Sequence, residues 1–151
     1  MSVWWSLTLS AEVQSVRVAR RRLLDAMAEC GVDPDVSYEL ALALSEACTN
    51  AVEHSGGSSS LEYHVTAYLE SDRCRIEVTD VGQGAKRFED PAANRAVRNE
   101  QYLPSGQVEH GRGLCLIKEL ADHVTFHNRP GEGATISFEK MLKRQEEIAA
   151  Q

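Results

Sequence analysis

Alternation of hydrophobic and polar residues predicts five strands along this chain. The clearest case runs from Leu61 to Leu69, where every second residue is apolar, the pattern of a strand with one buried face. Ser71 and Asp72 then interrupt the pattern, so the strands on either side of them are expected to form an antiparallel hairpin. The predicted strands cover residues 4–9, 61–69, 74–80, 124–128 and 134–139.

Apolar residues at helical spacing predict three helices. The first is expected to begin at an N-cap, Ser10, and to stop at Gly31. The second begins where Asp33 can cap and Pro34 can occupy the first turn, and it continues to His54. The third covers residues 114–121. The inward positions are expected to be Val13, Val16, Leu23, Leu24 and Met27 in the first helix and Leu114, Ile117, Leu120 and Ala121 in the third.

The order of these elements predicts an α+β fold, a two-layer sandwich with helices packed on a mainly antiparallel sheet. Residues 1–140 are expected to form a single domain. Residues 85–110 show no sustained periodicity, and a loop of this length is usually functional or disordered. Residues 141–151 form a charged, helix-prone tail.

Composition and charge narrow the class of protein. With 151 residues, 42% of them hydrophobic, the chain can bury a core without a metal or a disulfide. Its formal charge of −7 argues against binding nucleic acid. No apolar run reaches the roughly 18 residues that cross a membrane, and the start does not resemble a signal peptide. A soluble, cytoplasmic protein is therefore expected.

Two groups of side chains are expected to have ordinary structural roles. Four arginines of the first helix form a local basic cluster, and its spacing favours a solvated face over a partner surface. These are Arg17, Arg20, Arg21 and Arg22. The four cysteines, none in a C-x-x-C pair, are expected to be reduced core residues. They are Cys30, Cys48, Cys74 and Cys115.

Glu46, Asn50 and His54 lie four residues apart, so they form one stripe along the second helix. The Asn50 oxygen suits a hard cation such as Mg²⁺, which keeps several waters and bridges to phosphate. Glu46 could then accept the proton of a group that attacks a phosphate. The alternative is a solvated helix face.

Asp80 shares strand parity with Ile76 and Val78, so its carboxylate is expected to point into the core. A buried charge needs a hydrogen-bonding partner, either a backbone amide or a ligand amine such as that of adenine. Gly82 and Gly84 would let a flat ligand approach the backbone closely.

Gly111, Arg112 and Gly113 precede the third predicted helix, where phosphate could bind, although an ordinary turn has the same pattern. The dinucleotide G-x-G-x-x-G motif is not completed here, because the sixth position is Leu116, and no Walker-type P-loop occurs.

Together these motifs resemble the GHKL ATPase superfamily, with its Bergerat ATP-binding fold and mixed sheet. Glu46–His54 resembles the N-box and Asp80–Gly84 the first glycine box. Gly111–Leu114 resembles the second box and Gly131–Thr135 the last. The resemblance implies that Glu46 is the general base, that Asn50 holds Mg²⁺, and that Asp80 reads adenine with help from Thr135. It also implies an ATP lid at residues 85–110 and a phosphate contact from Arg112.

Within the superfamily, the chain is most similar to the bacterial anti-sigma factor serine/threonine kinases. That resemblance implies ATP and Mg²⁺ as cofactors, and a homodimer that binds a sigma factor. It also implies phosphorylation of a serine or threonine on an anti-anti-sigma (STAS-domain) partner. One alternative is an ATP-binding module that sequesters sigma without kinase activity. A histidine kinase catalytic domain is less favoured, because no phosphoacceptor hairpin precedes the motifs.

Overall fold

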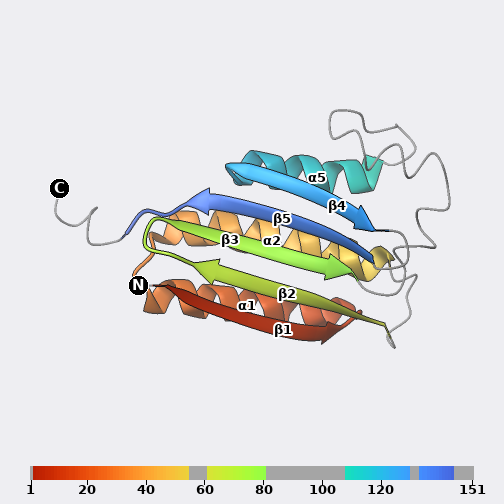
Figure 1. Ribbon diagram of the computed structural model, residues 1–151, viewed down its shortest axis with the longest axis horizontal. Coiled ribbons are helices and arrows are strands. Elements are labelled where there is room, and N and C mark those ends of the chain that lie inside the picture. Colours follow the sequence, from red (N-terminus) through yellow and green to blue (C-terminus); the bar gives the residue numbers. More distant parts are fainter. Residues whose placement is uncertain (1, 55–60, 81–107, 130–132, 145–151) are drawn as a thin grey trace.

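The computed structural model describes residues 2–54, 61–80, 108–129 and 133–144, which form a five-stranded sheet with helices on one face (Figure 1). Its strands lie in the order β1-β2-β3-β5-β4, and each neighbouring pair is antiparallel. The predicted two-layer α+β sandwich is therefore confirmed, and over the described residues its sheet is antiparallel rather than mixed. The strands are β1 (Val3–Ser10), β2 (Glu62–Leu69), β3 (Arg73–Asp80), β4 (His123–Arg129) and β5 (Gly133–Met141).

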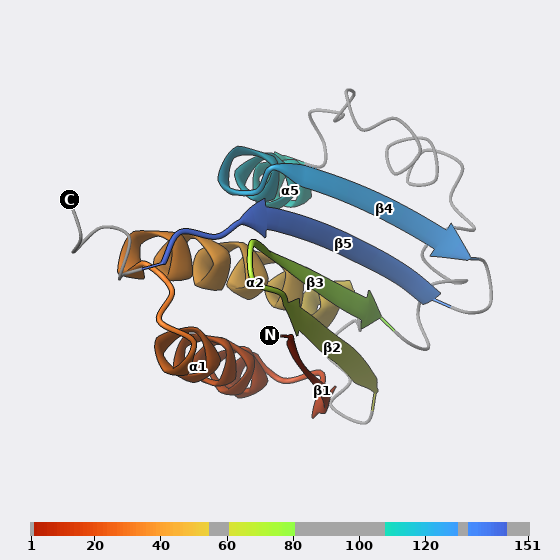
Figure 2. The ribbon, with the colours of Figure 1, turned by 60° about the vertical axis from the view of Figure 1, so that its left-hand side comes forward.

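Three described helices cover the same face of the sheet (Figures 1 and 2). They are α1 (Val13–Glu29), α2 (Pro34–His54) and α5 (Val108–Leu120). The core fills the space between the two layers, because alternate strand residues point toward the helices. On β2 these inward residues are Tyr63, Val65, Ala67 and Leu69, each at most 2% exposed.

The other face of the sheet carries mainly polar side chains. Its most prominent apolar feature is Trp4, which is 68% exposed and stacks on Tyr68 with ring centroids 6.5 Å apart. The Arg75 guanidinium lies over the same Tyr68 ring, 4.8 Å from its centroid. Strand residues on this face point away from the helices.

The start of α1 differs from the prediction. Ser10 is not the N-cap: it is the last residue of β1 and pairs with Glu62 of β2, so the helix begins later, after Glu12. The shift changes the buried face as well. Val13, predicted to face inward, is 75% exposed, and Ser15 is buried instead. The Ser15 hydroxyl donates to the Glu12 carbonyl and lies 2.6 Å from the Tyr63 hydroxyl, which satisfies this buried polar group.

The connection from α1 to α2 follows the prediction. Gly31 has a φ of +70°, a conformation that favours glycine, and its N–H donates to the Ala28 carbonyl while the Val32 N–H reaches Met27. These two bonds form a Schellman motif, which ends α1. The next helix, α2, begins at Pro34 and ends at His54, as the sequence predicted.

The helix α5 begins earlier than predicted. It starts at Val108 rather than Leu114, so Gly111 and Gly113 lie within the helix instead of preceding it. The inward face of its second half is confirmed, because Ile117 is fully buried and Leu114 and Leu120 pack against the core. Of the predicted lid, residues 85–107 lie outside the described residues and residues 108–110 belong to α5. Gly131, the first residue of the last glycine motif, also lies outside them.

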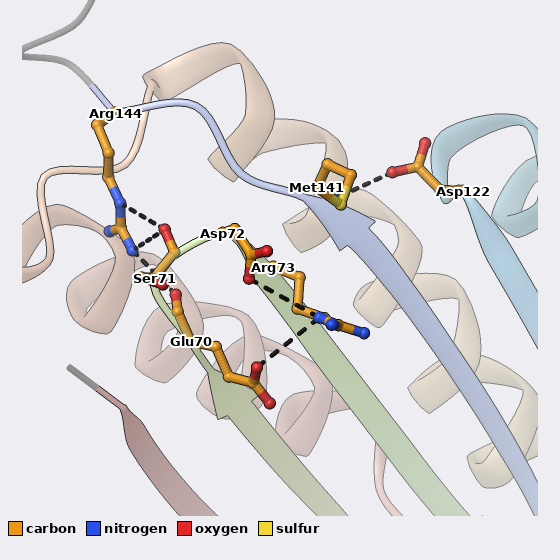
Figure 3. A network of polar contacts seen from close by, with 7 residues as sticks. All are labelled: Glu70, Ser71, Asp72, Arg73, Asp122, Met141 and Arg144. Carbon is orange, nitrogen blue, oxygen red and sulfur yellow. Dashed lines mark hydrogen bonds and ion pairs between the residues drawn. The ribbon is translucent and has the colours of Figure 1, made fainter.

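Polar contacts of Arg144 join three chain segments at the end of the sheet where β3 begins, and Figure 3 shows those to Glu70 and Ser71. The Arg144 guanidinium donates to the carbonyl oxygens of Cys30 at 2.7 Å and of Glu70 and Ser71 at 2.9 Å. The segment after β5 is therefore fixed to the α1–α2 connection and to the β2–β3 turn. Met141, predicted to open a helix-prone tail, is the last residue of β5.

Two further expectations concern the cysteines and the possibility of a membrane-spanning helix. All four cysteines are free, but only Cys48 and Cys74 are fully buried, and Cys115 is exposed on α5, against the prediction. Burial raises the pKa of the Cys48 thiol, and likewise that of Cys74, to about 12. None of the described helices has both the length and the apolar character that a membrane crossing requires.

Candidate functional site

A pocket lies between the second half of α2 and the adjoining ends of β3, β4 and β5. The space that can hold a water-sized sphere is about 20 Å³, and the volume rises to about 300 Å³ when space open to solvent is counted. Most of its walls are apolar, and three polar side chains enter it from two elements. The lining residues are Ala47, Asn50, Ala51, His54, Val78, Asp80, Phe126, Ala134 and Ile136.

Asp80 is the buried acid of this pocket. It is the last residue of β3 and, as its parity with Ile76 and Val78 predicts, it faces the helical layer and is only 5% exposed. Its neighbours across the sheet are Tyr63 on β2 and Ala134 on β5. A carboxylate held in such surroundings interacts strongly with any donor that enters the pocket, because little water competes for it.

His54 meets Asp80 across the pocket. Its Nδ1 atom lies 3.8 Å from Asp80 Oδ2, and the two side chains are 10% and 7% exposed. The distance is that of an ion pair rather than a hydrogen bond. His54 is the last residue of α2, so the pair connects the end of that helix to the end of β3.

The stripe predicted along α2 is only partly assembled in the pocket. Asn50 lines the pocket one turn before His54, whereas Glu46, a further turn back, is half-buried and outside the lining. The structure therefore brings Asn50, His54 and Asp80 together. It leaves Glu46 about two helical turns from His54 on the same stripe, since residues four apart are separated by roughly one turn.

Thr135 does not face the pocket. It pairs with Thr79 across β3 and β5, and the two hydroxyl oxygens lie 3.1 Å apart. Because side chains alternate along a strand, Thr135 lies on the opposite face from Asp80. Ala134, the direct neighbour of Asp80, takes the pocket position instead. The predicted assistance of Asp80 by Thr135 is wrong for this register.

The glycine motifs contribute less to the described pocket. Gly82 and Gly84 lie outside the described residues. Gly111, Arg112 and Gly113 belong to the early part of α5, whose side chains up to residue 113 are also not described. Leu114 packs against the core from the same helix. The phosphate site predicted around Gly111–Gly113 therefore stays a prediction.

The sequence did not single out the apolar walls of the pocket. Ala47 and Ala51 alternate with the predicted polar stripe, and their small side chains leave space beside Asn50 and His54. Phe126 and Ile136 face each other in the β4–β5 register and form the opposite wall. The available signal was the pair of alanines four residues apart on α2, next to the stripe.

The donor set fits a cation of the magnesium type. The described residues contain no group of three or more His, Cys, Asp or Glu side chains arranged to hold a metal. Asn50, however, offers an amide oxygen at the pocket. Mg²⁺ keeps several waters and is usually bound through one or two carboxylates plus phosphate oxygens, so the Asn50 amide would be one ligand among waters and phosphate oxygens.

The chain resembles known proteins over most of its length. The histidine kinase-like ATPase domain family matches residues 9–140 of the chain. The chain is 30% identical over 137 residues to the serine-protein kinase RsbW of Bacillus licheniformis, covering 89% of this chain and 83% of the relative. The RsbW of Halalkalibacterium halodurans is 31% identical over 149 residues, covering 93% and 84%.

Two solved structures share the fold. One contains the RsbU and RsbW domains of a Mycobacterium tuberculosis protein, with a TM-score of 0.67, 23% identity, and coverage of 94% of this chain and 33% of that one. The other is the SiaB–SiaC complex from Pseudomonas aeruginosa, with a TM-score of 0.65, 10% identity, and coverage of 91% and 89%.

Proposed function

The chain belongs to the histidine kinase-like ATPase domain family, and from this premise we propose that it is an ATP-dependent serine/threonine kinase and anti-sigma factor. The observation that carries the proposal is the convergence of Asn50, His54 and Asp80 on one largely apolar pocket. Similarity to serine-protein kinases over most of the chain supports the same activity.

In the proposed site, the Asp80 carboxylate accepts a hydrogen bond from the exocyclic amine of adenine. The apolar walls contact the faces of the ring, which favours a flat, weakly hydrated ligand. Asn50 would hold Mg²⁺, which when bound neutralises charge on the phosphate oxygens. The glycine-containing start of α5 would lie toward the phosphates, with Arg112 as a candidate contact.

Glu46 is proposed as the general base for phosphoryl transfer. It would take the proton of a serine or threonine hydroxyl as that oxygen bonds to the γ-phosphorus. The bond from the γ-phosphorus to the bridging oxygen of ADP breaks in the same displacement. The products are a phosphorylated partner and ADP, and the proton remains on Glu46 until solvent removes it.

The proposed protein substrate is an anti-anti-sigma protein with a STAS domain. The proposed sequestered partner is a sigma factor, bound by a homodimer of this chain in the cytoplasm. Phosphorylation would end the competition of the anti-anti-sigma protein for the kinase, and sigma would stay bound. The names of the RsbW relatives support the kinase part of this proposal.

The test uses the purified chain, γ-labelled ATP with Mg²⁺, and the STAS-domain and sigma proteins recovered with it from its native host. We expect label on a serine or threonine of the STAS-domain protein. Once that protein is phosphorylated, sigma should be recovered bound to this chain. Capture of sigma and binding of ATP without transfer would instead identify a sequestration module. Glu46→Ala serves as the control, because it should bind ATP without transferring label.

A further inference from the structure

A lysine occupies a core-facing position near the end of β5. Ala134, Ile136 and Phe138 are buried on the side of the strand that faces the helices, and Lys140 continues the same alternation. The Lys140 side chain is only 16% exposed. Lysine is rarely buried unless it is paired, so the contacts of its ammonium group indicate what this residue does.

The Lys140 ammonium joins two helices. Its Nζ atom donates to the Leu120 carbonyl at 2.8 Å and lies 2.9 Å from Glu39 Oε2. Leu120 is the last residue of α5, where carbonyl groups lack intrahelical donors and the helix dipole favours a cation. Glu39 belongs to the first half of α2. One side chain of the sheet therefore holds the end of α5 and the first half of α2 together.

The two neighbours of Lys140 bind the turn that follows α5. The Asp122 N–H donates to the Glu139 carbonyl at 2.9 Å. Asp122 Oδ2 accepts a hydrogen bond from the Met141 N–H at 2.7 Å (Figure 3). Three consecutive residues of β5 thus fix the C-terminal end of α5 to the sheet.

The two helices that Lys140 joins run in opposite directions (Figure 1). The first half of α2 and the end of α5 both contact the end of β5 through Lys140. The pocket residues Asn50 and His54 lie in the second half of α2, and the predicted phosphate motif Gly111–Gly113 lies in the first half of α5. Both helices are therefore held at the ends that lie away from the proposed nucleotide.

We infer that Lys140 is a positioning residue for the phosphate end of the nucleotide, because it sets the direction of α5 relative to α2. Lys140 lies outside the pocket lining, so it acts through the helices. Gly113 precedes Leu120 by roughly 10 Å along the helix axis. A small tilt at the held end of α5 would therefore displace the motif relative to Asn50. The inference rests on the proposed function, because it concerns the same nucleotide site.

The experiment is a calorimetric titration of the full chain with ADP and with AMP, both with Mg²⁺. The two ligands share the base, and only ADP carries a second phosphate. Lys140→Met retains the length of the side chain and removes the ammonium. It should weaken ADP binding about tenfold and AMP binding by less than about twofold, within the range of couplings between interacting groups. Lys143→Met, which removes an exposed lysine after β5, is the matched control and should leave both affinities unchanged.

Two further variants separate positioning from a general loss of stability. Lys140→Arg retains a cation of similar reach, so it should recover most of the ratio of ADP to AMP affinity. Glu39→Gln should lower this ratio in the wild type, and it should fold because the Glu39 side chain is 41% exposed. In a Lys140→Met background it should cause no further loss, because the ammonium that Glu39 binds is already absent.

Amide hydrogen exchange provides a measurement that does not depend on a ligand. The second half of α5 should exchange faster in Lys140→Met than in the wild type, because that end of the helix has lost a contact with the sheet. The β2–β3 hairpin, which Lys140 does not contact through its side chain, should exchange at the same rate in both proteins.

Equal losses for ADP and AMP in Lys140→Met would indicate a general structural effect and overturn the role of Lys140. Unchanged ADP affinity, additive losses from the two substitutions, or unchanged exchange in α5 would do the same while leaving the proposed kinase function intact. A wild-type chain that binds no ADP would overturn the proposed function itself, and the inference with it. The two failures are therefore distinguishable.

Discussion

Replacing Asp80 with asparagine should separate nucleotide binding from folding. Asparagine has nearly the same shape as aspartate but no charge, so it fits the 5% exposed position at the end of β3. It exchanges an ionised acceptor for a neutral amide beside His54. The substitution also removes a buried charge, which offsets part of the lost attraction to the imidazole 3.8 Å away. The fold should therefore survive while binding weakens.

The expected loss follows from the strength of a hydrogen bond to a charged group. Such bonds contribute about 1.5–3 kcal/mol, which corresponds to a roughly 10- to 150-fold weaker affinity for ADP. With ADP in excess, the same amount of ligand-induced stabilisation disappears. For a domain of this size, the rise in Tm on adding ADP should shrink by about 3–12 °C.

The assay is calorimetry with ADP and Mg²⁺, followed by thermal unfolding with and without ADP. Asp25→Asn is the matched control, because the Asp25 side chain on α1 is 65% exposed and lies outside the pocket lining. Its Oδ2 atom is 4.0 Å from Arg21 Nε. This variant should bind ADP like the wild type. If Asp80→Asn binds ADP within about twofold of the wild type, Asp80 does not read the base and the reasoning from its burial is refuted.

Three other substitutions or conditions test separate parts of the account. Glu46→Ala should retain ADP affinity and slow phosphoryl transfer, measured with labelled ATP, roughly 10²- to 10⁴-fold. Glu53→Ala on the same helix should not slow transfer. If Glu46→Ala loses ADP binding in proportion to transfer, Glu46 acts structurally. Thr135→Ala should leave ADP affinity within about twofold, because its side chain faces away from the pocket, and a tenfold loss in calorimetry would contradict the register. Burial raises the pKa of Cys48 and Cys74 to about 12, so the folded thiols stay protonated while the unfolded ones ionise near 8.5. The two thiols should therefore leave the free energy of unfolding unchanged below about pH 8.5 and lower it above that pH by up to about 1.4 kcal/mol per pH unit for each thiol. Urea titrations of Cys48→Ala should show a shallower fall with pH.

The sequence was sufficient where a local period determines geometry. Helical spacing placed Asn50 and His54 on one stripe, and strand parity placed Asp80 in the core, so their convergence needed only the correct pairing of α2 with β3. The bounds of α2 were also predictable, because Asp33 and Pro34 are strong start signals and act locally.

Long-range packing decided the features that the sequence did not predict. Ser10 has a good capping side chain, but pairing with β2 retains it in β1. Ser15 replaces Val13 on the buried face because its hydroxyl pairs with the Tyr63 hydroxyl. Tyr63 lies 48 residues away in the chain. No period within α1 reports that contact.

Two errors arose from assigning residues by motif alone. A one-residue shift on a strand exchanges the two faces, so Thr135 and Ala134 have opposite orientations although they are adjacent. The glycine motif predicts a helix that begins after Gly113, yet a glycine inside a helix costs only about 1 kcal/mol. Packing of the helix around Ile117 can offset that cost, and α5 begins before both glycines.

The location of the nucleotide site is tested most directly by amide hydrogen exchange of the full chain with and without Mg²⁺ and ADP. We predict slower exchange in the second half of α2, from Ala47 to His54, and at the end of β3 around Asp80. The exposed arginine face of α1 should be unaffected. Protection confined to α1 or to the outer face of the sheet, or no protection at millimolar ADP, would contradict the central claim.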